Sequence, residues 1–164
     1  SFHSALRSAM RAVPDVIMVG EMRDVETISM AITAAETGHL VLATLHTTNA
    51  VRSLDRLIDV FPPREQEQIR AMVSESMRGV ISQQLLPRKD GTGVAPALEI
   101  MFATSAVGNL IRENKTFQLP SVLQTGRKQG MVTMDESIRE LLSKGVITPE
   151  VARYHAEDPS TMKG

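Results

Sequence analysis

Two short apolar runs, separated by a helical pattern, restrict the possible folds of this chain more than any other feature. Residues 16–19 read V-I-M-V and residues 40–45 read L-V-L-A-T-L, and both runs are too short for typical helices. Such runs are typical of strands that are buried on both faces. Between them, Asp24 is a predicted helix N-cap and Gly38 a predicted C-cap. The sequence therefore predicts a βαβ unit with parallel strands and a right-handed crossover.

Helical periodicity flanks this unit on both sides. The first thirteen residues predict an amphipathic helix, whose apolar stripe consists of Phe2, Leu6, Ala9, Met10 and Val13. A further helix is predicted to begin near Thr48 or Asn49 and to be broken by Pro62 and Pro63. A long helix is predicted from Arg64 to about residue 85, because apolar residues recur there at helical spacing.

The remainder of the chain predicts a hairpin and then short helices. The turn-rich stretch R-K-D-G-T-G at residues 88–93 separates two apolar runs, and Pro96 in the second run favours an edge strand. Beyond Thr104 the pattern predicts short helices. Thr133 and Thr148 are predicted N-caps, and Pro149 suits the first helical position after the latter.

Composition excludes several classes of protein. The chain has 164 residues, of which 42% are hydrophobic, and this length suits a domain of ordinary size. A net charge of −1 gives no electrostatic signature of nucleic-acid binding. No apolar run approaches the ~18 residues of a membrane span. The absence of cysteine excludes disulfides and thiolate metal sites, and it fits a reducing compartment.

The predicted unit brings an acid and a histidine to one edge of its sheet. Parallel strands joined by a crossover end at the same edge, where ligands of open α/β sheets bind. Glu21 follows the first strand and His46 follows the second, so Glu21 could polarise a water and His46 could contact a phosphate oxygen. Thr47 and Thr48 add hydroxyl groups at this edge.

Structural interpretations of these residues stay open at this point. Glu21 could be a solvated loop residue, and His46 could cap the helix that follows it. His39 lies seven residues before His46 and would face the opposite side of a continuous strand, so the two are not expected to share a metal.

Two segments resemble motifs of the secretion ATPase superfamily. Residues 15–24, D-V-I-M-V-G-E-M-R-D, resemble its Walker B region, in which Gly20 stands where most P-loop enzymes carry an aspartate. Residues 37–50, T-G-H-L-V-L-A-T-L-H-T-T-N-A, resemble its His box. The resemblance covers essentially the whole chain and is strongest to the pilus retraction, or twitching-motility, ATPases.

This resemblance implies roles for individual residues. Glu21 would activate the attacking water for ATP hydrolysis, and His46 would contact the γ-phosphate. Gly20 and Thr47 would belong to the nucleotide-binding edge, as would Arg23. For Arg23 an equally good interpretation from the residues is a surface ion pair with a neighbouring carboxylate.

A second motif distinguishes members of the superfamily. Pilus-extension and type II secretion motors usually carry paired C-x-x-C motifs after the His box, and this chain has none. The resemblance also places the retraction signature A-I-R-N-L-I-R-E at residues 106–113, where this chain reads A-V-G-N-L-I-R-E. The departure is Gly108, where the family has arginine. The matching residues are Ala106, Asn109, Leu110, Ile111, Arg112 and Glu113, and they also suit an ordinary amphipathic helix.

The resemblance implies an α/β fold with two parts. Residues 1–103 would form the C-terminal part of a RecA-like P-loop NTPase domain, and residues 104–164 a small helical subdomain. ATP and Mg²⁺ would be bound mainly through a Walker A loop, but the sequence contains no G-x-x-x-x-G-K-[ST]. This stretch alone is therefore expected not to hydrolyse ATP.

The implied assembly is a cytoplasmic homohexamer that is peripheral to the inner membrane. It would contact the pilus inner-membrane platform protein, with no nucleic acid and no membrane span of its own. Two alternatives stay open: a pilus-extension or type II secretion ATPase of the same superfamily, and a non-catalytic interaction module derived from it.

Overall fold

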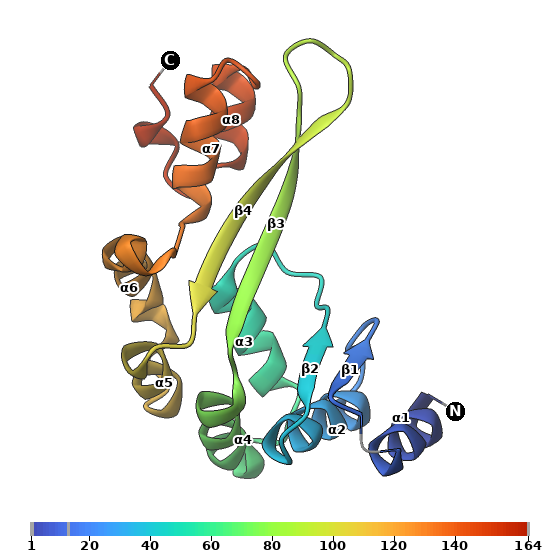
Figure 1. The fold of residues 1–164 in the computed structure, drawn as a ribbon. Helices are drawn as coiled ribbons and strands as arrows, with labels where there is room; N and C mark the ends of the chain where they lie inside the picture. Colours follow the sequence, from blue (N-terminus) through green and yellow to red (C-terminus); the bar gives the residue numbers. More distant parts are fainter. Residues whose placement is uncertain (1, 13, 164) are drawn as a thin grey trace. The chain divides into compact units, whose positions relative to one another are not determined.

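The computed structural model describes residues 2–12 and 14–163, which form helices and two small sheets (Figure 1). Its helices and strands, in chain order, are α1 (Phe2–Arg11), β1 (Val16–Val19), α2 (Val25–Glu36), β2 (Leu40–Ala43), α3 (Ala50–Asp59), α4 (Pro63–Ser76), β3 (Gly79–Pro87), β4 (Val94–Phe102), α5 (Ser105–Arg112), η1 (Thr116–Gln118), α6 (Leu119–Thr125), η2 (Gly126–Gln129), α7 (Met134–Ser143), α8 (Pro149–His155) and η3 (Pro159–Thr161). Among the described residues, no helix is both long and apolar enough to cross a membrane.

The chain divides into two compact units, each built from several segments. The first consists of Ser1–His46, Ser53–Arg78 and Ala103–Thr116, and the second of Thr47–Arg52, Gly79–Phe102 and Phe117–Gly164. The units thus place the hairpin with the C-terminal helices, and α5 with the parallel strands. The two domains expected from the sequence, residues 1–103 and 104–164, differ from these two compact units. That domain boundary stays a prediction.

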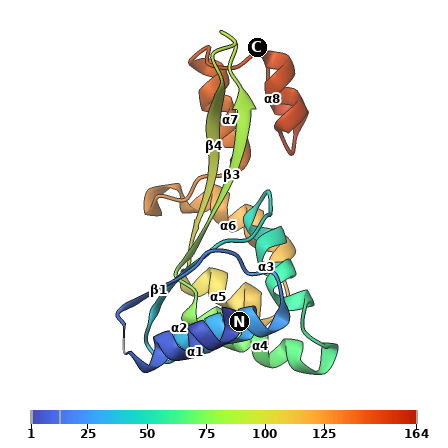
Figure 2. The same cartoon turned by 90° about the vertical axis from the view of Figure 1, so that its right-hand side faces the viewer.

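The first unit contains the predicted βαβ arrangement. Strands β1 and β2 pair in parallel, with Val16 opposite Leu40 and Val19 opposite Ala43. The connecting helix α2 packs against β2 and against α1 (Figure 2). The apolar stripe expected for residues 1–13 falls on side chains outside the described ones. The parallel pairing confirms that both strands end at the same edge.

The two parallel strands are not buried on both faces, so that expectation is wrong for this chain. Ile17 and Val19 are buried, whereas Val16 is 50% and Met18 77% exposed. In β2, Leu42 is also half exposed. Successive side chains of a strand point to opposite faces, and α2 packs against β2.

Local capping signals set the ends of α2. The Asp24 carboxylate accepts a hydrogen bond from the Thr27 backbone N–H at 2.8 Å, which confirms the predicted N-cap. The helix ends at Glu36, and Gly38 follows with a φ of +99°, a conformation that favours glycine. The predicted stop is therefore confirmed, with Thr37 as the C-cap and Gly38 one residue beyond it.

The long helix predicted from Arg64 to about residue 85 is wrong in its second half. Helix α4 ends at Ser76, and Gly79–Pro87 forms strand β3 instead. The nine residues of β3 pair antiparallel with the nine of β4, from Gly79 opposite Phe102 to Pro87 opposite Val94. Pairing with the next strand of the hairpin outweighs the helical spacing, and β-branched residues such as Val80 favour it.

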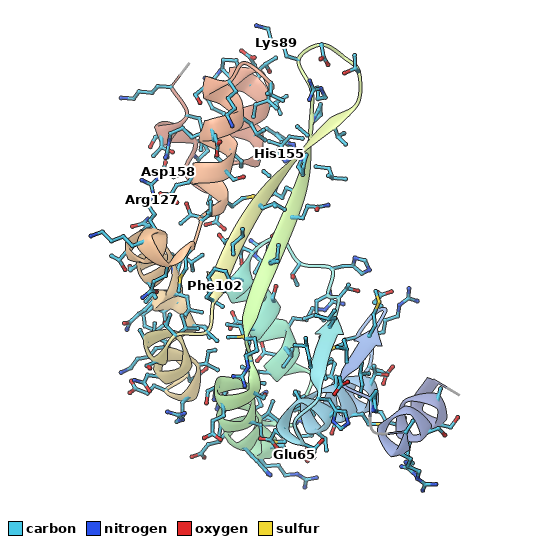
Figure 3. All side chains as sticks on the ribbon, in the orientation of Figure 1. Glu65, Lys89, Phe102, Arg127, His155 and Asp158 are labelled. Atoms are coloured by element: carbon cyan, nitrogen blue, oxygen red, sulfur yellow. The ribbon has the colours of Figure 1, made fainter. Side chains whose placement is uncertain are left out.

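The second unit is built around this hairpin, as the turn-rich stretch predicted. Helix α7 packs against β4 and helix α8 against β3, both on the same side of the hairpin (Figure 1). The imidazole Nδ1 of His155, labelled in Figure 3, lies 3.1 Å from Gln84 Oε1 of β3. The buried core between these elements consists of Leu86, Ala97, Met134, Ile138, Ile147, Ala152 and Met162. Each leucine, isoleucine or methionine in this core contributes about 1.5–3 kcal/mol of transfer free energy.

The caps predicted in the C-terminal half are also confirmed. The Thr133 hydroxyl accepts the Glu136 backbone N–H and the Glu136 carboxylate accepts the Thr133 N–H, which forms a capping box at the start of α7. Thr148 caps α8, with Pro149 at its first position. Thr104, which is not among the predicted caps, caps α5 by accepting the Val107 N–H.

Candidate functional site

The loops that follow β1 and β2 are tied together at the carboxyl edge of the parallel sheet. The Met22 backbone N–H donates to the Thr44 carbonyl at 3.0 Å. The Thr44 hydroxyl donates to the Gly20 carbonyl. These two bonds extend the contact between the strands beyond their last paired residues. They hold the backbone on either side of Glu21 next to the loop that leads to His46.

Glu21 and His46 meet at this edge, as predicted. The His46 Nε2 atom lies 3.0 Å from Glu21 Oε1, and Arg23 Nη2 lies 2.5 Å from Glu21 Oε2. The Glu21 side chain is only 25% exposed, whereas His46 and Arg23 are 75% and 77% exposed. The Glu21 carboxylate is thus the least exposed of the three groups. One nitrogen atom, from His46 or Arg23, contacts each of its oxygen atoms.

The electrostatics of the cluster favour an ionised Glu21. The hydrogen bond from Arg23 lowers the pKa of Glu21 below its ordinary value of 4.5, and the nearby His46 acts in the same direction. In return, Glu21 raises the pKa of Arg23. Arg23 therefore forms an ion pair with a neighbouring carboxylate, Glu21, as considered from the sequence. The other neighbouring carboxylate, Asp24, caps α2.

Arg56 of α3 is a contributor that the sequence reasoning missed. Its guanidinium donates to the His46 backbone carbonyl at 3.1 Å and so holds the loop at His46. The next residue before it, Asp55, accepts a hydrogen bond from the Thr116 hydroxyl at 2.8 Å. Arg56 lies in α3 and His46 in the loop before it, so the periodicity of a single helix or strand does not reveal their contact.

The other predicted residues have different surroundings. Gly20 contributes its backbone carbonyl, described above. Thr47 belongs to the second compact unit, and its role stays a prediction. The His39 imidazole Nδ1 lies 3.0 Å from the Ala34 carbonyl at the end of α2, which agrees with its structural interpretation.

Helix α5 carries the segment that resembles the retraction signature. Val107 and Ile111 are buried, Leu110 is half-buried, and the remaining matched residues, Ala106, Asn109, Arg112 and Glu113, are exposed. Asn109 and Arg112 line an open polar pocket of about 310 Å³ together with residues at the end of α4. The surface of α5 is therefore amphipathic, as its spacing predicted.

Gly108 lies buried where α5 packs against α4. A Cβ atom at this position would come within 3.2 Å of the Ser74 backbone carbonyl oxygen. Any side chain here, including the arginine of the resembled signature, would place its Cβ closer to that oxygen than an ordinary van der Waals contact. The departure at Gly108 thus coincides with a close approach of two helix backbones.

The groups at the carboxyl edge suit an anionic ligand. Arg23 and His46 offer exposed nitrogen donors beside a sheltered carboxylate. Over the described residues there is no cluster of three or more His, Asp or Glu side chains that could hold a metal. Mg²⁺ commonly uses one or two carboxylates together with waters and substrate phosphates, so the single carboxylate of Glu21 fits that mode of binding.

A carboxylate and a histidine at the carboxyl edge of parallel strands, within an α/β fold, are features expected of a nucleotide hydrolase. The family model described as "Type II/IV secretion system protein" matches residues 1–157. The chain therefore belongs to the type II/IV secretion system protein family.

Similar proteins agree with this assignment. The chain is 57% identical over 162 residues to the twitching motility protein of Neisseria gonorrhoeae and 54% identical over 158 residues to the type IV pilus retraction ATPase PilT of Pseudomonas aeruginosa. These alignments cover 99% and 96% of this chain, but only 43% and 46% of the relatives. The chain thus spans less than half the length of these curated relatives.

A solved structure supports the fold. The crystal structure of the pilus retraction motor PilT with bound ADP superposes with a TM-score of 0.87 at 46% identity, covering 98% of this chain and 45% of that one. The predicted fold class, the C-terminal part of a RecA-like ATPase domain, is confirmed by this match.

Proposed function

We propose that this chain is part of an ATP-hydrolysing motor that powers type IV pilus retraction and twitching motility. The observation that carries the proposal is the 3.0 Å contact between Glu21 and His46 at the carboxyl edge of the parallel strands. The names of the similar proteins, a twitching motility protein and a pilus retraction ATPase, support the same function. The absence of cysteine argues against the extension and secretion motors, which usually carry paired C-x-x-C motifs.

In this proposal Glu21 orients the water that attacks the γ-phosphate of ATP. Its pKa is lowered, so it is ionised at neutral pH and acts as a hydrogen-bond acceptor. Each carboxylate oxygen has two lone pairs, so the bonds to Arg23 and His46 leave room for one to a water. The attacking water loses its proton as the bond from phosphorus to the ADP oxygen breaks, and Glu21 is placed to accept that proton.

His46 and Arg23 contribute positive charge or hydrogen bonds at the same edge. Both side chains are exposed beside Glu21, and their nitrogen atoms could contact phosphate oxygens. Bound Mg²⁺ would neutralise charge on the phosphates and would be held mainly by them and by a phosphate-binding loop. That loop is expected outside these 164 residues, because they contain no G-x-x-x-x-G-K-[ST].

The test is Glu21→Gln in the full-length protein. Glutamine keeps the shape of the side chain but is a much weaker base, so turnover should fall by about 10²–10⁴-fold while ATP still binds. Steady-state ATPase rates and equilibrium nucleotide binding measure the two quantities separately. Glu36→Gln, on the exposed end of α2, serves as a matched control and should leave both unchanged. Normal turnover in the Glu21 variant would exclude this residue as the catalytic base.

The direction of pilus movement is tested in cells. Expression of the full-length gene in a strain that lacks its retraction ATPase should restore twitching. Restored pilus assembly in a strain that lacks its extension ATPase would instead favour the extension motor. The proposed homohexamer, its location at the inner membrane and its contact with the platform protein follow from the same assignment. The mass of the full-length protein in solution tests the hexamer.

A further inference from the structure

Glu99 of β4 is a buried carboxyl group that contacts the first residues of two helices. Its side chain lies in the second compact unit, and the residue is only 7% exposed. Glu99 Oε1 accepts the Ala50 backbone N–H at 2.8 Å, and Oε2 accepts the Met134 N–H at 3.2 Å. Ala50 begins α3 and Met134 begins α7, and N–H groups in a first helical turn have no partner within the helix. One carboxylate therefore satisfies an orphan donor in each helix.

Burial of the Glu99 carboxyl group costs free energy, because the charged form loses its contact with water. Loss of solvent raises its pKa, the two backbone N–H groups act in the opposite direction, and the carboxylates of Glu157 and Asp135 raise the pKa further. An apolar side chain would avoid the cost of burying a carboxyl, but it would leave both N–H groups without an acceptor. The carboxyl group supplies hydrogen-bond acceptors for both N–H groups, which an apolar side chain cannot do.

The start of α3 is held from a second side as well. The Asn49 side-chain amide donates to Glu157 Oε1 at 2.6 Å, while its oxygen accepts the Arg52 N–H at 2.8 Å. The Asp135 carboxylate in the first turn of α7 accepts the backbone N–H groups of Glu157 and Asp158 at 2.8 and 2.9 Å. Asp158 is labelled in Figure 3. The segment from Thr47 to Arg52 is thus joined to β4, to α7 and to the C-terminal stretch.

We propose that Glu99 is a positioning residue for His46, acting through residues 47–50 at the start of α3 without touching the nucleotide. Ala50 and Asn49 lie four and three residues after His46 in the chain. A fixed start of α3 restricts the path available to the intervening residues. The same carboxylate holds the start of α7, so within the second unit it joins the start of α3 to the C-terminal helices. This role rests on the proposed function of His46.

The first arm of the test measures the contact itself in the full-length protein without nucleotide. Glu99→Leu removes both acceptors at similar volume, so amide hydrogen exchange at Ala50 should rise about tenfold, as expected for the loss of one hydrogen bond to a charged acceptor. Glu136→Gln is the matched control. It weakens the cap of α7, where Glu136 pairs with Arg127 (labelled in Figure 3), and should leave Ala50 unchanged.

An unchanged exchange rate at Ala50 in Glu99→Leu, or an equal rise in Glu136→Gln, would overturn the proposal. If Glu99→Leu does not fold, Glu99→Gln tests the same contacts, because its side-chain amide has only one oxygen for two backbone N–H groups. Amide exchange should then rise at Ala50 or at Met134. Wild-type exchange at both positions would overturn the proposal.

The second arm measures ATP turnover in the same full-length variants. Glu99→Leu should lower kcat about tenfold and leave KM for ATP within about twofold, because a misplaced His46 impairs the chemical step more than binding. Glu136→Gln should retain wild-type kcat. Wild-type kcat in Glu99→Leu, together with faster exchange at Ala50, would exclude a role in turnover. A wild-type protein without ATPase activity would refute the proposed function, whereas the exchange arm would still decide whether Glu99 holds the segment.

Discussion

Each oxygen of the Glu21 carboxylate is contacted by a nitrogen atom, from His46 or from Arg23. These contacts favour the ionised carboxylate. Arg23 contributes most to the lowered pKa, through a direct hydrogen bond. A carboxyl of lowered pKa stabilises the folded state above its unfolded-state pKa, and this stabilisation is lost as the pH falls through the folded-state value. In this chain that loss therefore occurs below pH 4.5, the ordinary value for glutamate.

Arg23→Ala tests this account of Glu21. Without the guanidinium, the pKa of Glu21 should rise toward its ordinary value, so the carboxyl should protonate at a higher pH than in the wild type. NMR titration of the Glu21 side-chain carboxyl carbon measures the shift directly. Arg64→Ala, which removes the exposed pair of Arg64 and Glu65, should leave the titration of Glu21 unaltered. Identical titration in Arg23→Ala and the wild type would contradict the account.

At the scale of elements, the contact between α4 and α5 depends on a glycine. Gly108 lies in the middle of α5, where glycine costs about 1 kcal/mol relative to alanine in helix propensity. Its buried position next to the Ser74 carbonyl explains why this cost is accepted. The absence of a Cβ lets the two helix backbones approach.

Gly108→Ala should therefore lower the free energy of unfolding by about 1 kcal/mol, because overpacking costs about 1–3 kcal/mol and outweighs the gain in propensity. Urea denaturation measures this change. Ser105→Ala, at the exposed first position of the same helix, should stay within about 0.5 kcal/mol of the wild type. A more stable Gly108→Ala variant would show that the helices have room for a side chain.

At the scale of the whole molecule, the edge that carries Glu21 offers one carboxylate, one histidine and one arginine for a nucleotide. Tight binding of ATP generally depends on a loop whose backbone N–H groups and lysine hold the phosphates. These 164 residues contain no such motif. The curated relatives, which are more than twice as long, include much sequence beyond the matched part.

A polypeptide limited to these 164 residues should consequently show no micromolar affinity for ATP and no hydrolysis. Isothermal calorimetry with Mg²⁺-ATP measures the affinity, and the full-length protein serves as the positive control. A micromolar Kd for the short polypeptide would show that the Glu21 edge binds nucleotide without a phosphate loop.

Much of the fold and site follows from local sequence signals. Asp24, Thr133 and Thr148 are caps in the structure as in the sequence prediction, because a cap depends on residues within one helical turn. The meeting of Glu21 with His46 also follows from the sequence, because the handedness of a βαβ crossover leaves both strand ends at one edge.

Tertiary structure decided the features that depend on distant partners. Helical spacing continues past Ser76, yet pairing with β4 converts Gly79–Pro87 into a strand. In the sequence, Glu99 has no feature that distinguishes it from other strand residues. Its hydrogen bonds to the backbone N–H groups of Ala50 and Met134 span 49 and 35 positions of sequence. Hydrogen bonds between such distant residues have no periodic signature, so they become visible only once the chain has folded.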